Sequence, residues 1–537
     1  MPYNFAGGGG GDQGWLLPPD PREWLPGGHL AWAVRDAVAQ MDLAPFVAWY
    51  RADGQGKKAY HPALMVALVM YCYCKGIRSS RAVEMATFDD VGARVLAENL
   101  HPDHATIARF VSRHEQAVKG LLVASLVACA RQGLVSVDVV AGDGTKVKAN
   151  ASMAANATVA GLEADIAGLE QLLEAEVTAW LEQAKAADAA EDALFGGGDD
   201  GRGPGGGPGS LARLTGKIVR RQQAKAKLEA AQAARRQQAE AGHAAKITRL
   251  ERRAADRRAG AGRLAAQATA RVQDYQRRAA AKAAAGARNR PDGRIPVPAG
   301  RHSAVRRARA AAAKAQQALG QAAAQQAAAA APAKPPKVNT TDPASGVMPA
   351  KKGGFGQLHN VQALAGKHQV IYAIGTHPNA TDTGALHPLL EKGRANLDAA
   401  GITSPIGTAL FDAGYASDDN FTTSCEPELY VAVTREARQT GRLRDGKHPQ
   451  TMKASWQQMA ARLDTPEGKA LYRQRAGIIE PVFAQLFSRL GRNLNYRDTK
   501  TGLELHLWAA THNLLKAIRA QARTTVTSPP GRLAPAT

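Results

Sequence analysis

Cysteine is scarce in this sequence of 537 residues, which contains four. They are Cys72, Cys74, Cys129 and Cys425. Thiols this few and scattered exclude a disulfide framework. No second cysteine pair or nearby histidine completes a zinc site with the pair at 72 and 74. We therefore expect small buried thiols in a reducing cytoplasm.

Long apolar runs are also missing. No run approaches the roughly 20 residues that a membrane span needs. The first residues carry a glycine run, Gly7–Gly11, and a proline-rich stretch, where a signal peptide would have an apolar core. We expect a soluble cytoplasmic protein without a membrane partner.

The chain has an excess of positive charge, and this excess is confined to one segment. The chain has 69 Lys and Arg against 47 Asp and Glu, a formal net charge of +22. Residues 201–335 hold 29 basic and 6 acidic residues, so the remainder, with 40 and 41, is nearly neutral. This balance favours a polyanionic partner, of which nucleic acid is the commonest. Ribosomal and membrane-surface proteins show the same balance.

The basic segment is dominated by Ala, Arg, Gln and Gly, which indicates a solvated helical arm. Residues 162–181, before it, carry an apolar stripe in steps of three and four with acidic residues between. A Gly/Pro hinge at 196–209 separates the two. An acidic helix folded back on a basic one is one interpretation, and disorder over 183–335 is the other. Prolines break any single long helix at Pro291, Pro296 and Pro298, and again at 332, 335 and 336.

The first 125 residues are predicted to be helical. Amphipathic stretches with capping residues beside them lie at 61–74, 81–87 and 104–114. The first should bury one face, and the third should leave Arg109 and Arg113 on its outer side. Helix, tight turn and helix with exposed arginines suit a helix-turn-helix DNA reader. An ordinary helical bundle with a basic face is the alternative.

Two predicted strands end at an aspartate. Residues 134–143 are rich in alternating valines and end at Asp143, and residues 406–411 are followed by Asp412. Further strands are predicted at 360–364 and 370–374, as a hairpin around Gly366, and at 429–433. Glu480 lies in the first turn of a helix predicted over 479–489. Carboxylates suit Mg²⁺ or Mn²⁺, and two such ions about 4 Å apart promote phosphodiester chemistry. The chain has 47 Asp and Glu residues, and these patterns alone do not select the three acids from among them.

Several ordered blocks resemble the DDE transposases of bacterial insertion sequences. The three catalytic blocks of that family are similar to VAGDGTKVKANAS at 140–152, FDAGY at 411–415 and EPVF at 480–483. Its other blocks are similar to GIRSSR at 76–81, DHATIARF at 103–110, VNTTDPAS at 338–345, HNVQA at 359–363 and ATHNLLK at 510–516.

The resemblance implies an α/β ribonuclease-H-like catalytic domain with a helical N-terminal domain and a long helical, low-complexity insertion. The implied parts are a helix-turn-helix-like DNA-binding domain at 1–125, a catalytic domain in two pieces at 126–155 and 337–525, the insertion at 156–336 and a disordered tail at 526–537.

The resemblance also implies a transposase that binds terminal inverted repeats in double-stranded DNA and catalyses metal-dependent hydrolysis and strand transfer. It would act as a homo-oligomer on DNA and associate with the nucleoid. Asp143, Asp412 and Glu480 would be catalytic and would hold two Mg²⁺ or Mn²⁺ ions. The expected DNA contacts are Arg78, Arg81, Arg109, Arg113, Lys146, Tyr472, Arg475 and Arg489.

Two departures from the family pattern concern the glutamate helix. Tyr472 and Arg475 precede Glu480, but Arg475 is one residue further from it than usual. The usual lysine position holds Phe487, and Arg489 is the candidate substitute. The alternative is therefore a catalytically decayed, transposase-derived DNA-binding protein. A structural coiled-coil protein would explain the charge but not the strand-end motifs.

Overall fold

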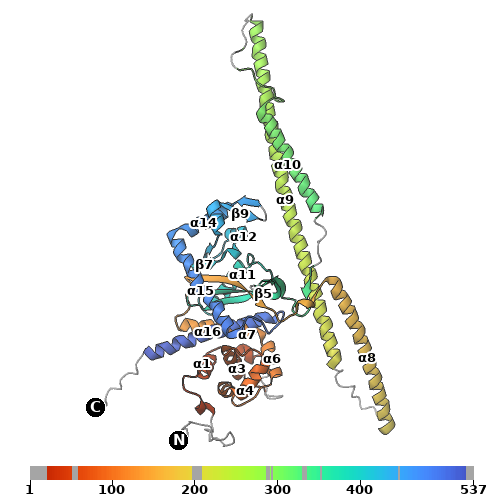
Figure 1. Ribbon diagram of the computed structural model, residues 1–537, viewed down its shortest axis with the longest axis vertical. Helices are drawn as coiled ribbons and strands as arrows, with labels where there is room; N and C mark the ends of the chain where they lie inside the picture. The colour runs from red at the N-terminus through yellow and green to blue at the C-terminus, as the bar shows by residue number, and fades with distance from the viewer. Residues whose placement is uncertain are drawn as a thin grey trace, which may run out of the picture. The chain divides into compact units, whose positions relative to one another are not determined.

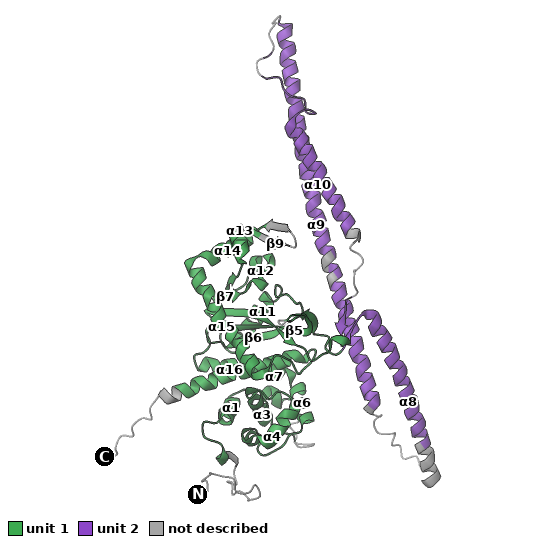
Figure 2. Ribbon diagram, in the orientation of Figure 1, with its two compact units in different colours: residues 1–155, 341–537 green, residues 156–340 purple. Residues whose placement is uncertain are grey.

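The computed structural model (Figure 1) describes residues 21–50, 59–195, 209–285, 291, 294–328, 336–350, 353–445 and 448–527. The chain forms two compact units, residues 1–155 with 341–537 and residues 156–340 (Figure 2). Most of the predicted hinge at 196–209 and of the predicted tail at 526–537 lies outside the described residues. Among the described helices, none combines the length and apolar character that a bilayer crossing requires.

The first unit begins with a helical part. Its helices are η1 (Pro21–Trp24), α1 (Leu30–Ala39), α2 (Ala44–Val47), α3 (Pro62–Cys74), α4 (Ser80–Asp89), α5 (Val91–Leu96), α6 (His104–Arg113) and α7 (Glu115–Arg131). The predicted caps form, because Ser79 Oγ accepts from Ala82 N at 3.2 Å and Asp103 Oδ1 accepts from Thr106 N at 2.7 Å.

One prediction about these helices was wrong, and one helix was not predicted. Helix α3 is buried on every side and not on one face, since α1, α4, α5 and α16 (Lys500–Thr527) all pack around it. Helix α5, which Asp90 caps, lies between α4 and α6 and was not predicted.

A mixed sheet forms the centre of the same unit. Its strands are β1 (Val139–Lys148), β4 (Gly346–Pro349), β5 (Phe355–Gly366), β6 (Ile371–His377), β7 (Thr408–Phe411) and β8 (Glu428–Val431). The order is β4-β5-β1-β7-β8, with β6 also paired to β5. Strand β5 is antiparallel to β1, β4 and β6, whereas β7 is parallel to both β1 and β8. The hairpin predicted around Gly366 is confirmed.

The predicted end of the first strand was wrong. Asp143 lies in the middle of β1, because β5 pairs with β1 from Val140 as far as Lys148. The small-residue turn expected at Gly144 is therefore part of the strand. The parallel pairing with β7 ends earlier, at Ala141, so Asp143 lies just beyond it.

Helices cover both faces of this sheet. Helix α11 (Leu386–Ala399) packs on the face of Leu364, where Gly393 leaves room for that side chain. Leu364 pairs with Gly142, so the neighbouring Asp143 points to the opposite face, over which α15 (Pro466–Leu490) packs. The remaining elements are η2 (Met153–Ala155), η3 (Ala413–Tyr415), α12 (Asp418–Thr422), α13 (Arg435–Thr440), β9 (Arg442–Asp445), β10 (His448–Thr451) and α14 (Ala454–Asp464).

The second unit consists of long helices and a short strand pair. Its elements are β2 (Asn156–Ala157), α8 (Val159–Phe195), α9 (Gly209–Ala284), α10 (Ser303–Ala328) and β3 (Val338–Asn339). Acidic α8 lies antiparallel to the start of α9, with ion pairs from Arg221 to Asp165 at 3.0 Å and from Lys225 to Glu163 at 2.8 Å.

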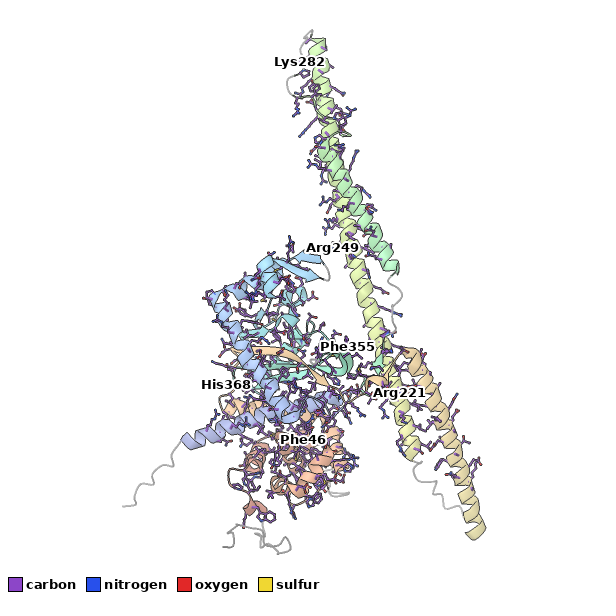
Figure 3. All side chains as sticks on the ribbon, in the orientation of Figure 1. Phe46, Arg221, Arg249, Lys282, Phe355 and His368 are labelled. Atoms are coloured by element: carbon purple, nitrogen blue, oxygen red, sulfur yellow. The ribbon has the colours of Figure 1, made fainter. Side chains whose placement is uncertain are left out.

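The rest of α9 packs against α10. Its buried residues there, Ala254, Ala261 and Ala268, recur every seven positions, as in a coiled-coil seam. Arg258 of α9 donates to Gln316 of α10 at 3.0 Å. The side chains that point away from this seam include many of the basic residues, of which Arg249 and Lys282 are labelled in Figure 3.

Candidate active site

Two predicted catalytic aspartates lie side by side on neighbouring parallel strands. Ala141 of β1 pairs with Leu410 of β7. Asp143 and Asp412 each lie two residues further along these parallel strands, so they are at the same level. Asp143 Oδ1 accepts from Gly144 N at 2.8 Å, and Asp412 Oδ1 accepts from Gly414 N at 3.0 Å. The sheet therefore brings together two carboxylates that are 269 positions apart.

Burial raises the pKa values of both aspartates above the usual value for this side chain. Burial raises the pKa of Asp143; the Arg475 guanidinium opposes this shift, and the neighbouring Asp412 adds to it. Burial also raises the pKa of Asp412, against the hydrogen bond from Gly414 N and with a contribution from Asp382. When both carboxylates are ionised, they repel each other, and this repulsion contributes to the raised pKa of Asp143. A cation beside them would relieve the repulsion.

Glu480 reaches the site from α15. The helix begins at Pro466, where Thr465 Oγ1 caps it by accepting from Gly468 N at 2.9 Å, so the prediction that Glu480 lies in a first turn was wrong. The side chain of Glu480 is 62% exposed. Its Oε1 atom lies 3.9 Å from Nη2 of Arg475, whose Nη1 lies 3.5 Å from Oδ2 of Asp143.

Arg475 is thus positioned between two of the three predicted metal ligands. Its side chain is 16% exposed. One helical turn earlier, the Tyr472 hydroxyl donates to the carbonyl of Phe411, the residue before Asp412, at 3.2 Å. Two predicted DNA contacts, Tyr472 and Arg475, therefore hold the carboxylates in place.

The donor set has the chemistry of a divalent-metal site. Asp143, Asp412 and Glu480 offer hard oxygen ligands, which Mg²⁺ and Mn²⁺ prefer. Within the described part of the chain, no three His, Cys, Asp or Glu side chains gather closely enough to share one ion. The two aspartates lie on adjacent strands, whereas Glu480 is linked to Asp143 through Arg475.

A polar network that the sequence analysis missed supports the aspartates from behind. Asp382, in the loop after β6, accepts hydrogen bonds from Asn360 Nδ2 and Gln362 Nε2, both at 2.7 Å. The hydroxyl of Tyr415 donates to Gln362. A side chain at position 144 would overlap this network, since its Cβ would lie 2.4 Å from Gln362 Nε2. The sequence carried one sign of this network: Asn360 and Gln362, two residues apart on a strand inside the HNVQA block, point to the same face of the sheet.

The predicted DNA contacts fall into different environments. Arg81, Arg109 and Arg113 are exposed. Lys146 is half-buried and lies 3.7 Å from Asp382. Arg78 is 11% exposed and pairs at 2.9 Å with Glu504, which is fully buried, so the structure gives Arg78 a structural role.

The cations near the end of α15 also differ from prediction. Arg489, the candidate substitute for the usual lysine, has its Nε and Nη2 atoms buried. At the usual lysine position, the ring of Phe487 stacks on Phe483 and lies 4.3 Å from the Arg492 guanidinium carbon. Arg492, which the sequence analysis did not single out, is therefore the cation beside Phe487.

Two family models match the chain. One describes a transposase domain and matches residues 19–113, and the other describes a transposase DDE domain and matches residues 434–518. The second match contains Glu480 and Arg475, whereas Asp143 and Asp412 lie outside both matches. Comparisons with curated proteins and with solved structures gave no match.

Proposed function

We propose that the chain is a DDE transposase of the insertion-sequence type, which both family matches support, and that it binds the terminal inverted repeats of its element and cuts and rejoins DNA there. The observation that carries this proposal is the pairing of Asp143 and Asp412 on adjacent parallel strands, with Glu480 linked to Asp143 through Arg475.

We infer a ribonuclease-H-like catalytic domain from the strand arrangement. Strands β6, β5 and β1 are successive antiparallel neighbours, and β7 and β8 follow on the other side of β1 in parallel. In that fold, catalytic acids lie on the first strand and after the fourth strand, the positions of Asp143 and Asp412 in this chain. The insertion enters between them, which leaves the sheet intact.

The chain's own residues have separate roles in this proposal. Asp143, Asp412 and Glu480 would hold divalent ions, which polarise the scissile phosphate and activate the attacking oxygen. Arg475 orients Asp143 and Glu480 before metal and DNA arrive. Tyr472 anchors the end of β7 and so fixes Asp412. The exposed arginines of α4 and α6, Arg81 among them, would contact the element ends.

The direct test is cleavage of duplex DNA that contains an element end. Wild-type protein should cut it with Mg²⁺ or Mn²⁺ and not with EDTA, and Asp412→Asn should bind the same DNA without cutting it. Inverted repeats in the DNA that flanks the gene would supply the substrate. Asp412→Asn protein that cuts at the wild-type rate would overturn the assignment.

The second candidate function is end binding by a catalytically decayed transposase, which the replacement of the usual lysine by Phe487 favours. It predicts wild-type protein that binds element ends and fails to cut them under every metal condition. The position of Arg492 beside Phe487 supports the active enzyme, because a cation is present in that region.

A further inference from the structure

A cavity of about 240 Å³ lies at the turn between β5 and β6, away from the carboxylates. Its lining residues are Leu134, His368, Gln485, Lys516, Arg519, Ala520 and Arg523. The turn is separated from Asp143 along the sheet, since Gly366 pairs with Val140 whereas Asp143 pairs with Ala363. Those three residues correspond to roughly 10 Å. His368, labelled in Figure 3, marks the turn.

The cations of this cavity come from one face of α16. Lys516, Arg519 and Arg523 follow one another at helical spacings of three and four. The part of α16 from Leu505 to its end contains no Asp or Glu. Lys516 is half-buried, whereas Arg519 and Arg523 are exposed at the rim. The cavity is therefore lined by positively charged side chains both at its exposed edge and in its half-buried part.

A further cation lies behind the lining. Arg489 is on α15, one helical turn after Gln485, and its Nε and Nη2 atoms are buried with no hydrogen-bond partner among the described residues. Burial and the nearby Arg519 lower the pKa of Arg489. Within the described residues, no carboxylate forms an ion pair with Arg489, Lys516 or Arg519, and Arg519 also disfavours the charged form of Lys516.

Gln369, which follows the lining residue His368 in the turn, is held in a strained conformation. Gln369 has a φ of +62°, which is unfavourable for a residue with a side chain. Its Oε1 atom accepts from Gln485 Nε2 at 2.9 Å and from Lys516 Nζ at 3.0 Å, and its backbone carbonyl accepts from His512 Nε2 at 2.8 Å. These bonds hold Gln485 and Lys516, two of the lining residues, in place.

We infer that this cavity is a second DNA site, which binds a phosphate of the duplex backbone independently of base sequence. The ammonium group of Lys516 and the guanidinium group of Arg519 have no carboxylate partner among the described residues, and together they match the several acceptor oxygens of a phosphate. A phosphodiester supplies those oxygens together with a negative charge. The inference rests on the proposed function only in taking DNA as the partner, since it involves neither the metal nor the carboxylates.

Two measurements in EDTA test the site without any contribution from cleavage. The first is binding to random duplex DNA across a salt series. Arg519→Gln should reduce the magnitude of the log Kd against log salt slope by about 0.9, the value for one phosphate contact, and Arg519→Lys should retain most of the slope. Arg35→Gln is the matched control, because it removes one exposed charge that Asp36 already neutralises.

The second measurement is the melting temperature in inorganic phosphate against chloride at equal ionic strength. Phosphate stabilises many proteins without binding at a specific site, so the result is the difference between the Tm shifts of the variants. Phosphate should raise the Tm of wild type and Arg35→Gln by more than that of Arg519→Gln or Lys516→Gln. Equal salt slopes for Arg519→Gln and wild type, or equal phosphate shifts in all four proteins, would overturn the inference. Loss of cleavage alone would leave both measurements unaffected.

Discussion

The Nη1 atom of Arg475 lies 3.5 Å from Oδ2 of Asp143, although the two residues are on different elements and are 332 positions apart. The same guanidinium reaches Glu480 with its other nitrogen, at 3.9 Å. A single arginine on α15 therefore links β1 to the helix that carries the third acid. The predictions for the active site follow from this link.

Arg475 should set the lower pH limit of cleavage. Burial raises the pKa of Asp143, and Arg475 opposes that shift. Asp143 must be ionised to bind metal, so cleavage should be lost as pH falls through its raised pKa. In Arg475→Gln the opposing charge is gone, the pKa rises further, and the acid limb of the rate profile should move to higher pH. Arg473→Gln, at an exposed neighbouring position, should keep the wild-type limb. An identical limb in Arg475→Gln would contradict this role.

Glu480 should be required for chemistry and not for folding or end binding. Its side chain is mostly exposed, so Glu480→Gln leaves the packing of α15 unchanged. Loss of a metal ligand removes several kcal/mol of transition-state stabilisation, which corresponds to about a thousandfold lower single-turnover rate. Asp143→Asn should behave alike. Glu467→Gln, an exposed acid in the first turn of the same helix, is the control and should cut normally. A Glu480→Gln rate within tenfold of wild type would remove Glu480 from the active site.

Much of the helical part could be predicted because its signals are local. Asp103 caps α6, and the next apolar residues of that helix, Ile107 among them, are buried as their spacing predicts. The hairpin around Gly366 was likewise predicted from two neighbouring strands. Where α15 begins could not be predicted from the residues around Glu480, because Thr465 caps the helix 15 positions earlier.

Other features depend on distant partners, which no single sequence window contains. Strand β1 continues past Asp143 because β5, more than 200 residues later, pairs with it. Arg78 and Arg489 were predicted to contact DNA, but their surroundings are set by α16. Asp382 is in an irregular loop, and only the folded sheet brings it to Gln362. The catalytic acids were found through the family resemblance, since strand patterns alone did not select them.

The buried ion pair between Arg78 and Glu504 should matter for stability. The Glu504 carboxylate is fully buried, and it also accepts from the backbone nitrogens of Asn495 and Tyr496 at 2.8 and 2.9 Å. Arg78→Ala leaves that charge buried without its partner, which should destabilise the unit by about 3–5 kcal/mol. Urea denaturation followed by circular dichroism measures this as a lower midpoint. Arg81→Ala, at an exposed position, should change stability by less than ~0.5 kcal/mol. Equal midpoints for the two variants would contradict the structural role of Arg78.

The basic arm, residues 201–335, should supply sequence-independent affinity for DNA. Among the described residues, the ion pairs with its acidic partner helix lie near the start of α9, at Arg221 and Lys225. Further along, Arg249 and its basic neighbours point into solvent, where they can contact phosphates without reading bases. Binding to random duplex should therefore weaken steeply with salt, by a slope of about −0.9 per phosphate contacted.

Two variants separate this role from that of an inert hairpin. Ala157 and Val338 are cross-strand partners, so a short Gly/Ser turn can join them and replace everything between. The second variant keeps the hairpin and changes the exposed arginines at 249, 252, 253 and 257 to glutamine, which preserves helix propensity. Both should flatten the salt slope. Both should still discriminate element ends from random DNA, because the helices of residues 21–131 are expected to carry that preference. An inert hairpin predicts wild-type slopes in both variants. A flattened slope in the deletion alone would mean that the contacts come from other parts of the arm than these arginines.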